Sequence, residues 1–279
     1  MSRSASPAAL VFGESVIDIH PAYSVVAGAP IHVAARLARY GWKVYLVNRV
    51  GADANGTSVR DELQRYGVVT DLIETDDVLP TGTVVVSYRD GDHCFDIRKP
   101  MAWDAVQGPD KLPAHDLLYF NTVVGRDPRS LSALERMLEK SKARVQLFDI
   151  NLRPPHHDAG LMARCLARAT LVKANEEEIP MAADILGFSP TPQAVFEAAP
   201  HLRWLCITLA DRGARLLVRD GRSWERAPSP RTVVDTVGAG DAFAAALAEA
   251  FLSGFGEEEA LAFAVEEASQ SVEAPGGLP

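Results

Sequence analysis

The sequence predicts an α/β fold, a three-layer αβα sandwich with a mostly parallel central sheet and a small β-sheet lid. Three observations carry this prediction. Short apolar runs recur along the chain, helical patterns lie between several of them, and a β-rich stretch at 81–104 interrupts the alternation. Buried strands that alternate with helices are typical of βαβ units, in which helices cover both faces of parallel strands.

The apolar runs are the expected strands of the central sheet. Each is short and nearly continuous in apolar residues, as expected for a strand that is buried on both faces. They lie within 9–20, 42–51, 116–123, 144–151, 169–176 and 204–213.

Helices are expected between these runs. The segment 29–41 has helical spacing of apolar residues and ends at a glycine, 56–67 has a similar pattern, and 127–143 starts with Asp-Pro. A further, nearly all-apolar helix is expected to start near 238–241. The alternation therefore continues through most of the chain.

The stretch 81–104 predicts the lid. Two β-rich runs flank the turn "RDGD" at 89–92, which is an antiparallel hairpin signal. Together with residues near 20–26, this stretch is expected to form a β lid on a single domain that covers 1–279. No internal repeat, low-complexity segment or long linker divides the chain.

Composition narrows the class of protein. The formal net charge of -9 disfavours binding to nucleic acid or to an anionic membrane surface. No apolar run reaches the roughly 18 to 20 residues that span a bilayer, and we expect a cytoplasmic protein. The widely spaced cysteines 94, 165 and 206 have no metal-binding pattern and are expected to be buried free thiols.

Polar residues at the ends of the expected strands predict a binding site. Ligands of open parallel sheets gather at the carboxyl ends of the strands. The sequence has neither a GxxxxGK[ST] phosphate loop nor a GxGxxG dinucleotide fingerprint after the first strand. The polar residues at these ends are Asp18, Asp149, Asn151, Arg153, Asn175, Glu178, Thr208 and Asp241.

The turn "DTVGAGDAF" at 235–243 predicts an anion-binding helix start. Gly238, Ala239 and Gly240 leave their backbone N–H groups accessible at the positive end of the helix dipole. Asp241 lies in the first turn, where it can take a proton from a hydroxyl that attacks a phosphoryl group. The same residues would also suit an ordinary helix start that Asp235 or Thr236 caps.

At this point the sequence resembles the ribokinase-like, or PfkB, family of carbohydrate kinases. The stretch 235–248 matches the C-terminal signature of the family, and 27–51 nearly matches the N-terminal one, with His32 where an Asn is expected. Further pieces occur in family order, namely "GESVID", "GADANG", "TGT", "FDINLRP", "VKANEEE" and "APGG". "GESVID" and "FDINLR" are most similar to fructokinases and 2-keto-3-deoxygluconate kinases.

The resemblance implies transfer of the γ-phosphoryl group of ATP to a sugar hydroxyl. Asp241 would be the general base, and Gly238, Ala239 and Gly240 would form the anion hole. Asn175 and Glu178 would orient Mg²⁺, partly through water, although "NEEE" is also an ordinary acidic helix start. Asp235 corresponds to a carboxylate that binds K⁺ in many members. The nucleotide would be bound by Lys173, Asn175, Thr208 and Gly213.

The resemblance also implies a sugar site. Asp18 would accept hydrogen bonds from sugar hydroxyls, Gly28 would let the backbone approach the ring, and Arg153 would reach substrate or phosphate. A turn carboxylate, a turn glycine and a surface arginine would look the same in the sequence. His32 either contacts a substituent of an unusual substrate or is a structural histidine without a ligand.

Two departures from the family pattern lie near the expected nucleotide. Ala210 stands where a Gly is usual, and Val265 where many members have a polar residue near adenine. A sugar-binding protein without turnover is therefore an alternative, but the complete turn with Asp241 favours a kinase. The expected partners are a small sugar and a second copy of the chain, since an open apolar lid face favours pairing as a homodimer.

Overall fold

The computed structural model describes residues 6–89, 92–153 and 158–279, and it confirms the α/β fold. The central sheet has nine strands in the order β13-β12-β11-β10-β9-β8-β1-β4-β5. All neighbours pair in parallel except β11 with β12 and β12 with β13. Its strands are β1 (Ala8–Phe12), β4 (Lys43–Gly51), β5 (Ile73–Asp76), β8 (Leu117–Asn121), β9 (Val145–Asp149), β10 (Leu171–Asn175), β11 (Trp204–Thr208), β12 (Ala214–Val218) and β13 (Ser223–Arg226).

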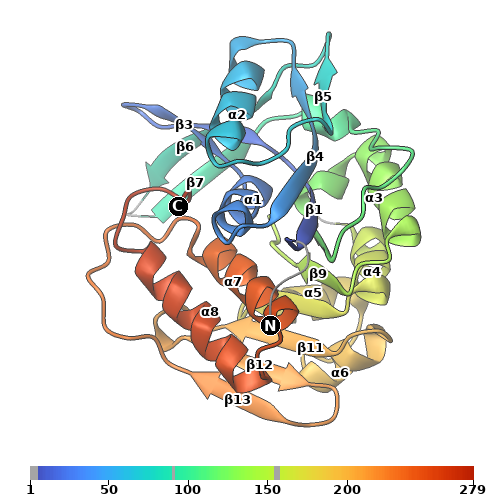
Figure 1. Ribbon diagram of the computed structural model, residues 1–279, viewed down its shortest axis with the longest axis vertical. Helices are drawn as coiled ribbons and strands as arrows, with labels where there is room; N and C mark the ends of the chain where they lie inside the picture. Colours follow the sequence, from blue (N-terminus) through green and yellow to red (C-terminus); the bar gives the residue numbers. More distant parts are fainter. Residues whose placement is uncertain (1–5, 90–91, 154–157) are drawn as a thin grey trace.

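Helices cover both faces of this sheet (Figure 1). On one face α1 (Ala29–Arg39), α2 (Ala54–Arg65), α7 (Ala239–Ser253) and α8 (Glu257–Ser271) share a hydrophobic core with the sheet. On the other face a second core contains side chains of α3 (Pro128–Lys140), α4 (Ala159–Arg168), α5 (Glu178–Leu186) and α6 (Pro192–Ala198). Short 3-10 helices occur at η1 (Ala102–Ala105), η2 (Val123–Arg126) and η3 (Ala210–Arg212).

The side chains of successive residues in a central strand pack alternately into the two cores. In β1, Ala9 and Val11 pack on the α1 side, while Leu10 and Phe12 pack on the α3 side, and all four are fully buried. This double burial explains why the strand sequences are nearly continuous in apolar residues. The molecule is thus the expected three-layer sandwich.

A second, smaller sheet forms the lid, which projects from one side of the sandwich (Figure 1). Its strand order is β3-β2-β6-β7, from β2 (Val16–Ile19), β3 (Ser24–Ala27), β6 (Gly82–Arg89) and β7 (Asp92–Ile97). The pair β2–β6 is parallel, and β2–β3 and β6–β7 are antiparallel. Residues 90 and 91 of the predicted turn and the side chains of 86–95, with that of Cys94, lie outside the described part of the structure.

The lid differs from its predicted bounds in two ways. The run 9–20 is two strands, because the chain leaves the central sheet after β1 and enters the lid as β2. Asp18 therefore lies on a lid strand, and its predicted place at the carboxyl end of the first central strand was wrong. The segment 98–104 contributes no strand and leads into η1. An apolar run alone does not show where a chain changes sheets.

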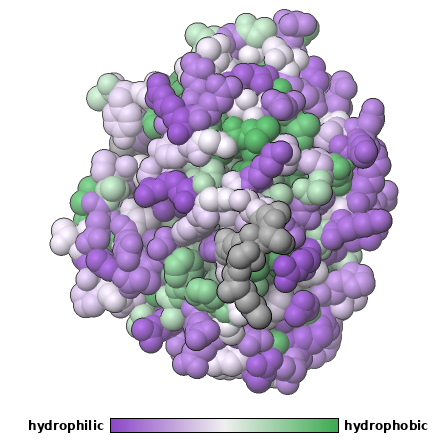
Figure 2. Space-filling model, viewed as in Figure 1, coloured by the Kyte–Doolittle hydropathy of each residue, from purple (hydrophilic) through white to green (hydrophobic). Residues whose placement is uncertain are grey.

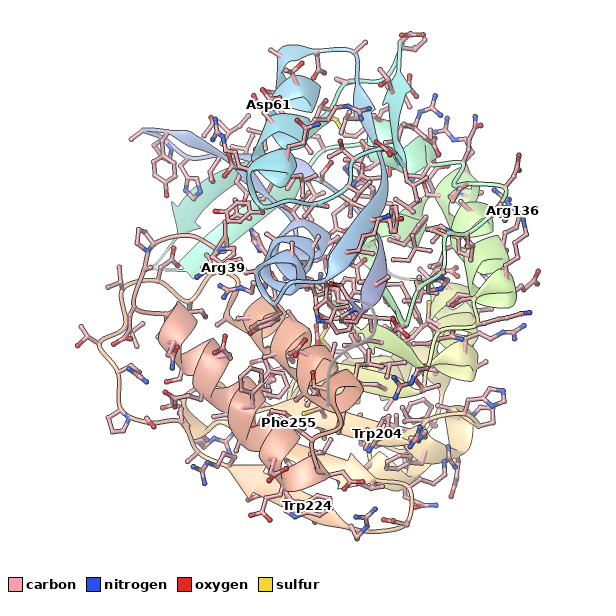
Figure 3. All side chains as sticks on the ribbon, in the orientation of Figure 1. Arg39, Asp61, Arg136, Trp204, Trp224 and Phe255 are labelled. Carbon is pink, nitrogen blue, oxygen red and sulfur yellow. The ribbon has the colours of Figure 1, made fainter. Side chains whose placement is uncertain are left out.

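α7 is buried on nearly all sides. Its alanines at 242, 244, 245, 246, 248 and 250 are at most 1% exposed, and it packs between α1 and α8. Small side chains let helices approach closely, which explains the alanine-rich composition. Near the carboxyl end of α7, Phe251 stacks on Trp204 at 4.4 Å between ring centroids. Figure 3 shows the labelled Trp204 and Phe255 in this lower part of the molecule, away from the lid.

The chain after α8 returns to the start of α7. The Gly276 N–H donates to Asp235 Oδ2 at 2.9 Å, Arg36 donates to the carbonyl of Gly277 at 3.3 Å, and the Tyr66 hydroxyl donates to the carbonyl of Pro279 at 3.0 Å. The last residues are thereby fixed against α1 and the residue that follows α2.

The surface features agree with the composition. The face that Figure 2 shows is mainly hydrophilic, with smaller hydrophobic areas between the polar ones. None of the helices in the described ranges has the length and apolar character of a membrane span. Cys165 and Cys206 are buried free thiols, as predicted.

Candidate active site

A cavity of about 360 Å³, here called the lid-side cavity, lies where the lid sheet faces the carboxyl ends of the central strands. Val16 and Val84 of the lid and Val123 form part of its apolar wall. The polar lining brings together residues from many elements, which are Glu14, Asp18, His32, Asn151, Arg153, Lys173, Asn175, Glu178, Thr208, Thr236 and Asp241.

A second cavity of about 730 Å³, the α8-side cavity, lies between α7, α8, η3 and the loop 228–236. Its wall is mainly apolar and includes Val265, Ala268 and Phe243. The lining residues common to the two cavities are Asn175, Thr208, Thr236 and Gly240. The two cavities therefore meet at the first turn of α7.

This first turn has the geometry of an anion site. Gly238 adopts φ 76, and a Cβ there would overlap Gly277, so glycine is required at this position. The Ala239 N–H donates to the carbonyl of Thr236 at 3.2 Å. The amides of Gly240 and Asp241 follow it in the first turn, where N–H groups have no partner within the helix. These two amides are the better candidates to bind an anion.

Asp241 is held by a histidine of α1. Nδ1 of His32 lies 2.7 Å from Oδ2 of Asp241, and both side chains are largely buried. Burial raises the pKa of Asp241, but the hydrogen bond and charge interaction with His32, together with Lys173 and Arg153, lower it by more. The net pKa lies below the ordinary aspartate value. Asp241 is therefore an ionised acceptor at neutral pH.

A buried cation lies next to the turn. Lys173 Nζ donates to Asp149 Oδ1 at 3.0 Å, and a Cβ on Gly240 would lie 3.1 Å from this ammonium. Burial lowers the pKa of Lys173, but Asp149, Glu178 and Asp241 raise it by more, so the ammonium stays charged. The Tyr119 hydroxyl donates to the other oxygen of Asp149 at 3.2 Å. An anion bound at the first turn of α7 would be attracted by the Lys173 ammonium.

Asn175 and Glu178 form a compact turn at the end of β10. The Asn175 side-chain oxygen accepts the N–H groups of Glu177 and Glu178 at 3.0 and 2.8 Å. Glu178 accepts the N–H of Leu152 at 2.9 Å with Oε1 and that of Asn175 at 2.8 Å with Oε2. Asn175 and Glu178 both line the lid-side cavity, and their hydrogen bonds to backbone N–H groups hold this part of its wall in place.

The Glu178 carboxylate in the wall of the lid-side cavity suits a Mg²⁺ ion that keeps most of its bound water. Within the described ranges no group of three or more His, Cys, Asp or Glu side chains could enclose a metal ion. Glu178 lines the lid-side cavity with one protein hydrogen bond on each carboxylate oxygen, which leaves lone pairs for water. Mg²⁺ is commonly bound by one or two carboxylates and substrate phosphates.

Asp235 fixes the loop before α7. Its Oδ1 accepts the Val237 N–H at 3.0 Å, and its Oδ2 accepts the Gly276 N–H at 2.9 Å. This carboxylate therefore has a structural role in joining the loop to the C-terminal segment.

A comparison with family models identifies the chain. Residues 7–278 match the model of the pfkB family carbohydrate kinases. The chain belongs to this family. It is a carbohydrate kinase, a phosphotransferase with an alcohol group as acceptor, as the sequence predicted.

Individual relatives agree with this assignment. The kinase is 30% identical over 256 residues to a fructokinase from Klebsiella pneumoniae, covering 85% of this chain and 82% of the relative. It is similar to an uncharacterized sugar kinase from Pyrococcus horikoshii, solved in complex with ATP, with TM-score 0.82, 25% identity and coverage of 96% and 93%. A putative ribokinase II from E. coli, solved with ATP and Mg²⁺, shares the fold with TM-score 0.83, 20% identity and coverage of 98% and 94%.

The structure of this carbohydrate kinase brings most of the predicted site residues together. Asp18, Gly28, His32 and Arg153 all line the lid-side cavity. Gly28 adopts φ 122, which favours glycine. Arg153 is exposed and donates to the carbonyl of Leu152 at 3.0 Å.

Of the residues predicted to bind the nucleotide, Lys173 lines only the lid-side cavity and Asn175 lines both cavities. Thr208 lines both cavities and Gly213 lines only the α8-side one, together with Ala210 and Val265. Ala210 adopts φ 54, a left-handed conformation that explains why a glycine would suit this position.

Sequence reasoning did not single out Glu14 and Asn121 of the kinase, and it placed Asp149 among the polar strand ends without giving it a function of its own. Glu14 is 5% exposed and lines the lid-side cavity, and Asn121 Nδ2 donates to it at 3.1 Å. Burial raises the pKa of Asp149 to about 6, despite Lys173. A polar residue directly after an apolar strand was the available signal, but burial of a carboxyl group depends on packing from distant segments.

Proposed function

We propose that this kinase transfers the γ-phosphoryl group of ATP to a hydroxyl of a small sugar. The observation that carries the proposal is the position of Asp241, at the helix start where the two cavities meet. The sugar would occupy the lid-side cavity and the nucleotide the α8-side cavity. Their reacting groups would then meet beside this carboxylate.

The chemistry follows from the groups at the junction. Asp241 accepts the proton of the sugar hydroxyl while the oxygen of that hydroxyl forms a bond to the γ-phosphorus and the bond to ADP breaks. The amides of Gly240 and Asp241 and the ammonium of Lys173 stabilise the negative charge of the phosphoryl group. The products are a sugar phosphate and ADP, and Asp241 returns its proton to water.

Mg²⁺ would be held by Glu178, partly through water, and would neutralise charge on the phosphates when bound. K⁺ at Asp235 stays a prediction, as do the cytoplasmic location and pairing of two chains through the lid. The lid strands contribute Val16, Val84 and Ile97 to the cavity wall, so closure of the lid would exclude water from the transfer.

The sugar site favours a polyhydroxyl compound. Asp18 and Asp241 offer acceptors, and Asn151 and Arg153 offer donors at the same cavity. The similarity to fructokinases makes fructose the first compound to test.

The proposal is tested by ADP release from purified protein with ATP and Mg²⁺, with and without K⁺. The acceptors are fructose, ribose, 2-keto-3-deoxygluconate, tagatose phosphate and a nucleoside. We expect turnover with one acceptor class. Absence of turnover with all of them, while a sugar or ATP still raises the melting temperature, would support a binding protein and contradict the proposal.

A further inference from the structure

His32 lies in the first turn of α1, 4% exposed, with Nδ1 at 2.7 Å from Asp241 Oδ2. An ionised carboxylate only accepts hydrogen bonds, so Nδ1 carries the hydrogen and donates it. One ring nitrogen is therefore already engaged by the carboxylate that we propose as the general base. It cannot contact a sugar at the same time without releasing Asp241.

The His32 ring is also fixed from the side of the C-terminal segment. A Cβ on Gly277 would overlap the ring atoms Cε1, Nδ1 and Nε2, so the ring packs directly against this glycine. The Gly277 carbonyl accepts a hydrogen bond from Arg36, and the neighbouring Gly276 N–H is bound to Asp235. The orientation of the ring is thus set before any ligand binds.

Several other charged or titratable groups act on Asp241, and His32 is distinguished among them by direct contact. The hydrogen bond from His32 lowers the pKa of Asp241 more than the charge of Lys173 or of Arg153 does. The other groups that act on Asp241 are the cations Lys173, Arg153 and Arg36, the acids Glu14 and Asp149, and the phenol of Tyr119.

We propose that His32 is a positioning residue that orients Asp241 for proton transfer, rather than a residue that binds the sugar. The inference rests on the proposed function, because it assigns the general-base role to Asp241. It predicts that loss of the imidazole acts on kcat and on the acid side of the pH profile, with little effect on the KM for sugar.

Three substitutions of His32 distinguish a ring that positions Asp241 from a ring that binds the sugar. Asparagine places an amide N–H near the position of Nδ1, whereas glutamine places its amide near Nε2. We expect His32→Ala and His32→Gln to lower kcat by about tenfold or more, to change the KM for sugar less than about threefold, and to shift the acid limb to higher pH. His32→Asn should recover part of kcat. The exposed His201→Ala is the matched control and should change neither parameter.

The opposite pattern would overturn the inference. If His32→Ala raised the KM for sugar about tenfold and left kcat and the acid limb unchanged, His32 would bind the sugar. Thermal unfolding of each variant shows whether the fold is retained.

A double-mutant cycle tests the packing of Gly277 on the ring. Gly277→Ala should lower kcat in the wild-type background, because its Cβ displaces the imidazole. It should have little further effect in His32→Ala, where the ring is absent. If Gly277→Ala lowered kcat equally in both backgrounds, Gly277 would not act through His32.

A last measurement requires no turnover. Nitrogen NMR spectra of histidine-labelled protein report which ring nitrogen of His32 carries the hydrogen, with no substrate present. We expect the Nδ1-protonated form in the wild type and its loss in Asp241→Ala. An unchanged His32 spectrum would overturn the pairing. If the pairing is observed but no sugar is phosphorylated, the proposed function fails and the contact itself stands.

Discussion

Glu14 is a carboxyl group buried between β1 and the lid, and burial raises its pKa to about 7. The hydrogen bond from Asn121 and the charge of Arg153 lower the pKa only in part. Since the ordinary value is 4.5, the folded state binds a proton between pH 4.5 and about 7 that the unfolded state has lost. The stability that this proton contributes is complete below pH 4.5 and is lost as the pH rises through about 7.

We therefore predict that Glu14→Gln removes this pH dependence. At pH 8 the variant should exceed the wild type in free energy of unfolding, by at most about 3 kcal/mol, because the amide need not ionise. Urea unfolding of both proteins from pH 4 to 8 measures the difference. A difference that is constant over this range would show that Glu14 titrates normally.

The start of α2 is joined to the first residues of the lid by one side chain. Asp53 caps α2 by accepting the Gly56 N–H at 2.8 Å, and it also accepts the N–H of Thr81 at 2.9 Å and its hydroxyl at 2.7 Å. Thr81 is 1% exposed and directly precedes β6.

We predict that Asp53→Ala lowers the free energy of unfolding by about 2 to 3 kcal/mol. The variant loses a helix cap and leaves a buried N–H without its acceptor. Asp53→Asn keeps a capping oxygen and should lose less. Denaturant unfolding gives both values, and a loss below about 0.5 kcal/mol for the alanine variant would mean that other groups replace these contacts.

The strands β1, β4, β8, β9, β10 and β11 and the helices α1, α2, α3 and α7 could be predicted from the sequence because their signals are local. The Asp-Pro start of α3 is one example, since Asp127 accepts the Arg129 N–H at 3.1 Å as a cap. The switch from β1 to β2 could not be predicted, because both strands are apolar and only their partners differ.

The candidate site shows the same division. The turn at 238–241 was visible as small residues around an acid. The contact of Asp241 with His32 joins residues 209 positions apart in sequence, and Gly238 packs on Gly277 of the C-terminal segment. Such contacts exist only after the sheet has brought α1, α7 and the C-terminal segment together.

At the scale of the whole molecule, the lid has an open edge. β3 is an outer strand of the lid sheet. Val25 on this strand is 36% exposed, and Tyr23 just before it is 59% exposed. An exposed edge with apolar side chains favours pairing with another chain.

We predict a homodimer through the lid in sedimentation velocity, and a monomer for Val25→Lys, which places a charge on the edge. A wild-type monomer at all concentrations would exclude this dimer.

The central claim is that Asp241 takes the proton of the sugar hydroxyl. Single-turnover phosphoryl transfer, measured with saturating sugar and ATP for wild type and Asp241→Asn, tests it most directly. The matched control is Asp61→Asn on α2, whose labelled side chain lies at the surface in Figure 3. We predict a rate constant lowered by about 10² to 10⁴ in Asp241→Asn, with dissociation constants for sugar and ATP within about threefold of the wild type. A rate constant within about tenfold of the wild type would contradict the assignment of Asp241 as the base.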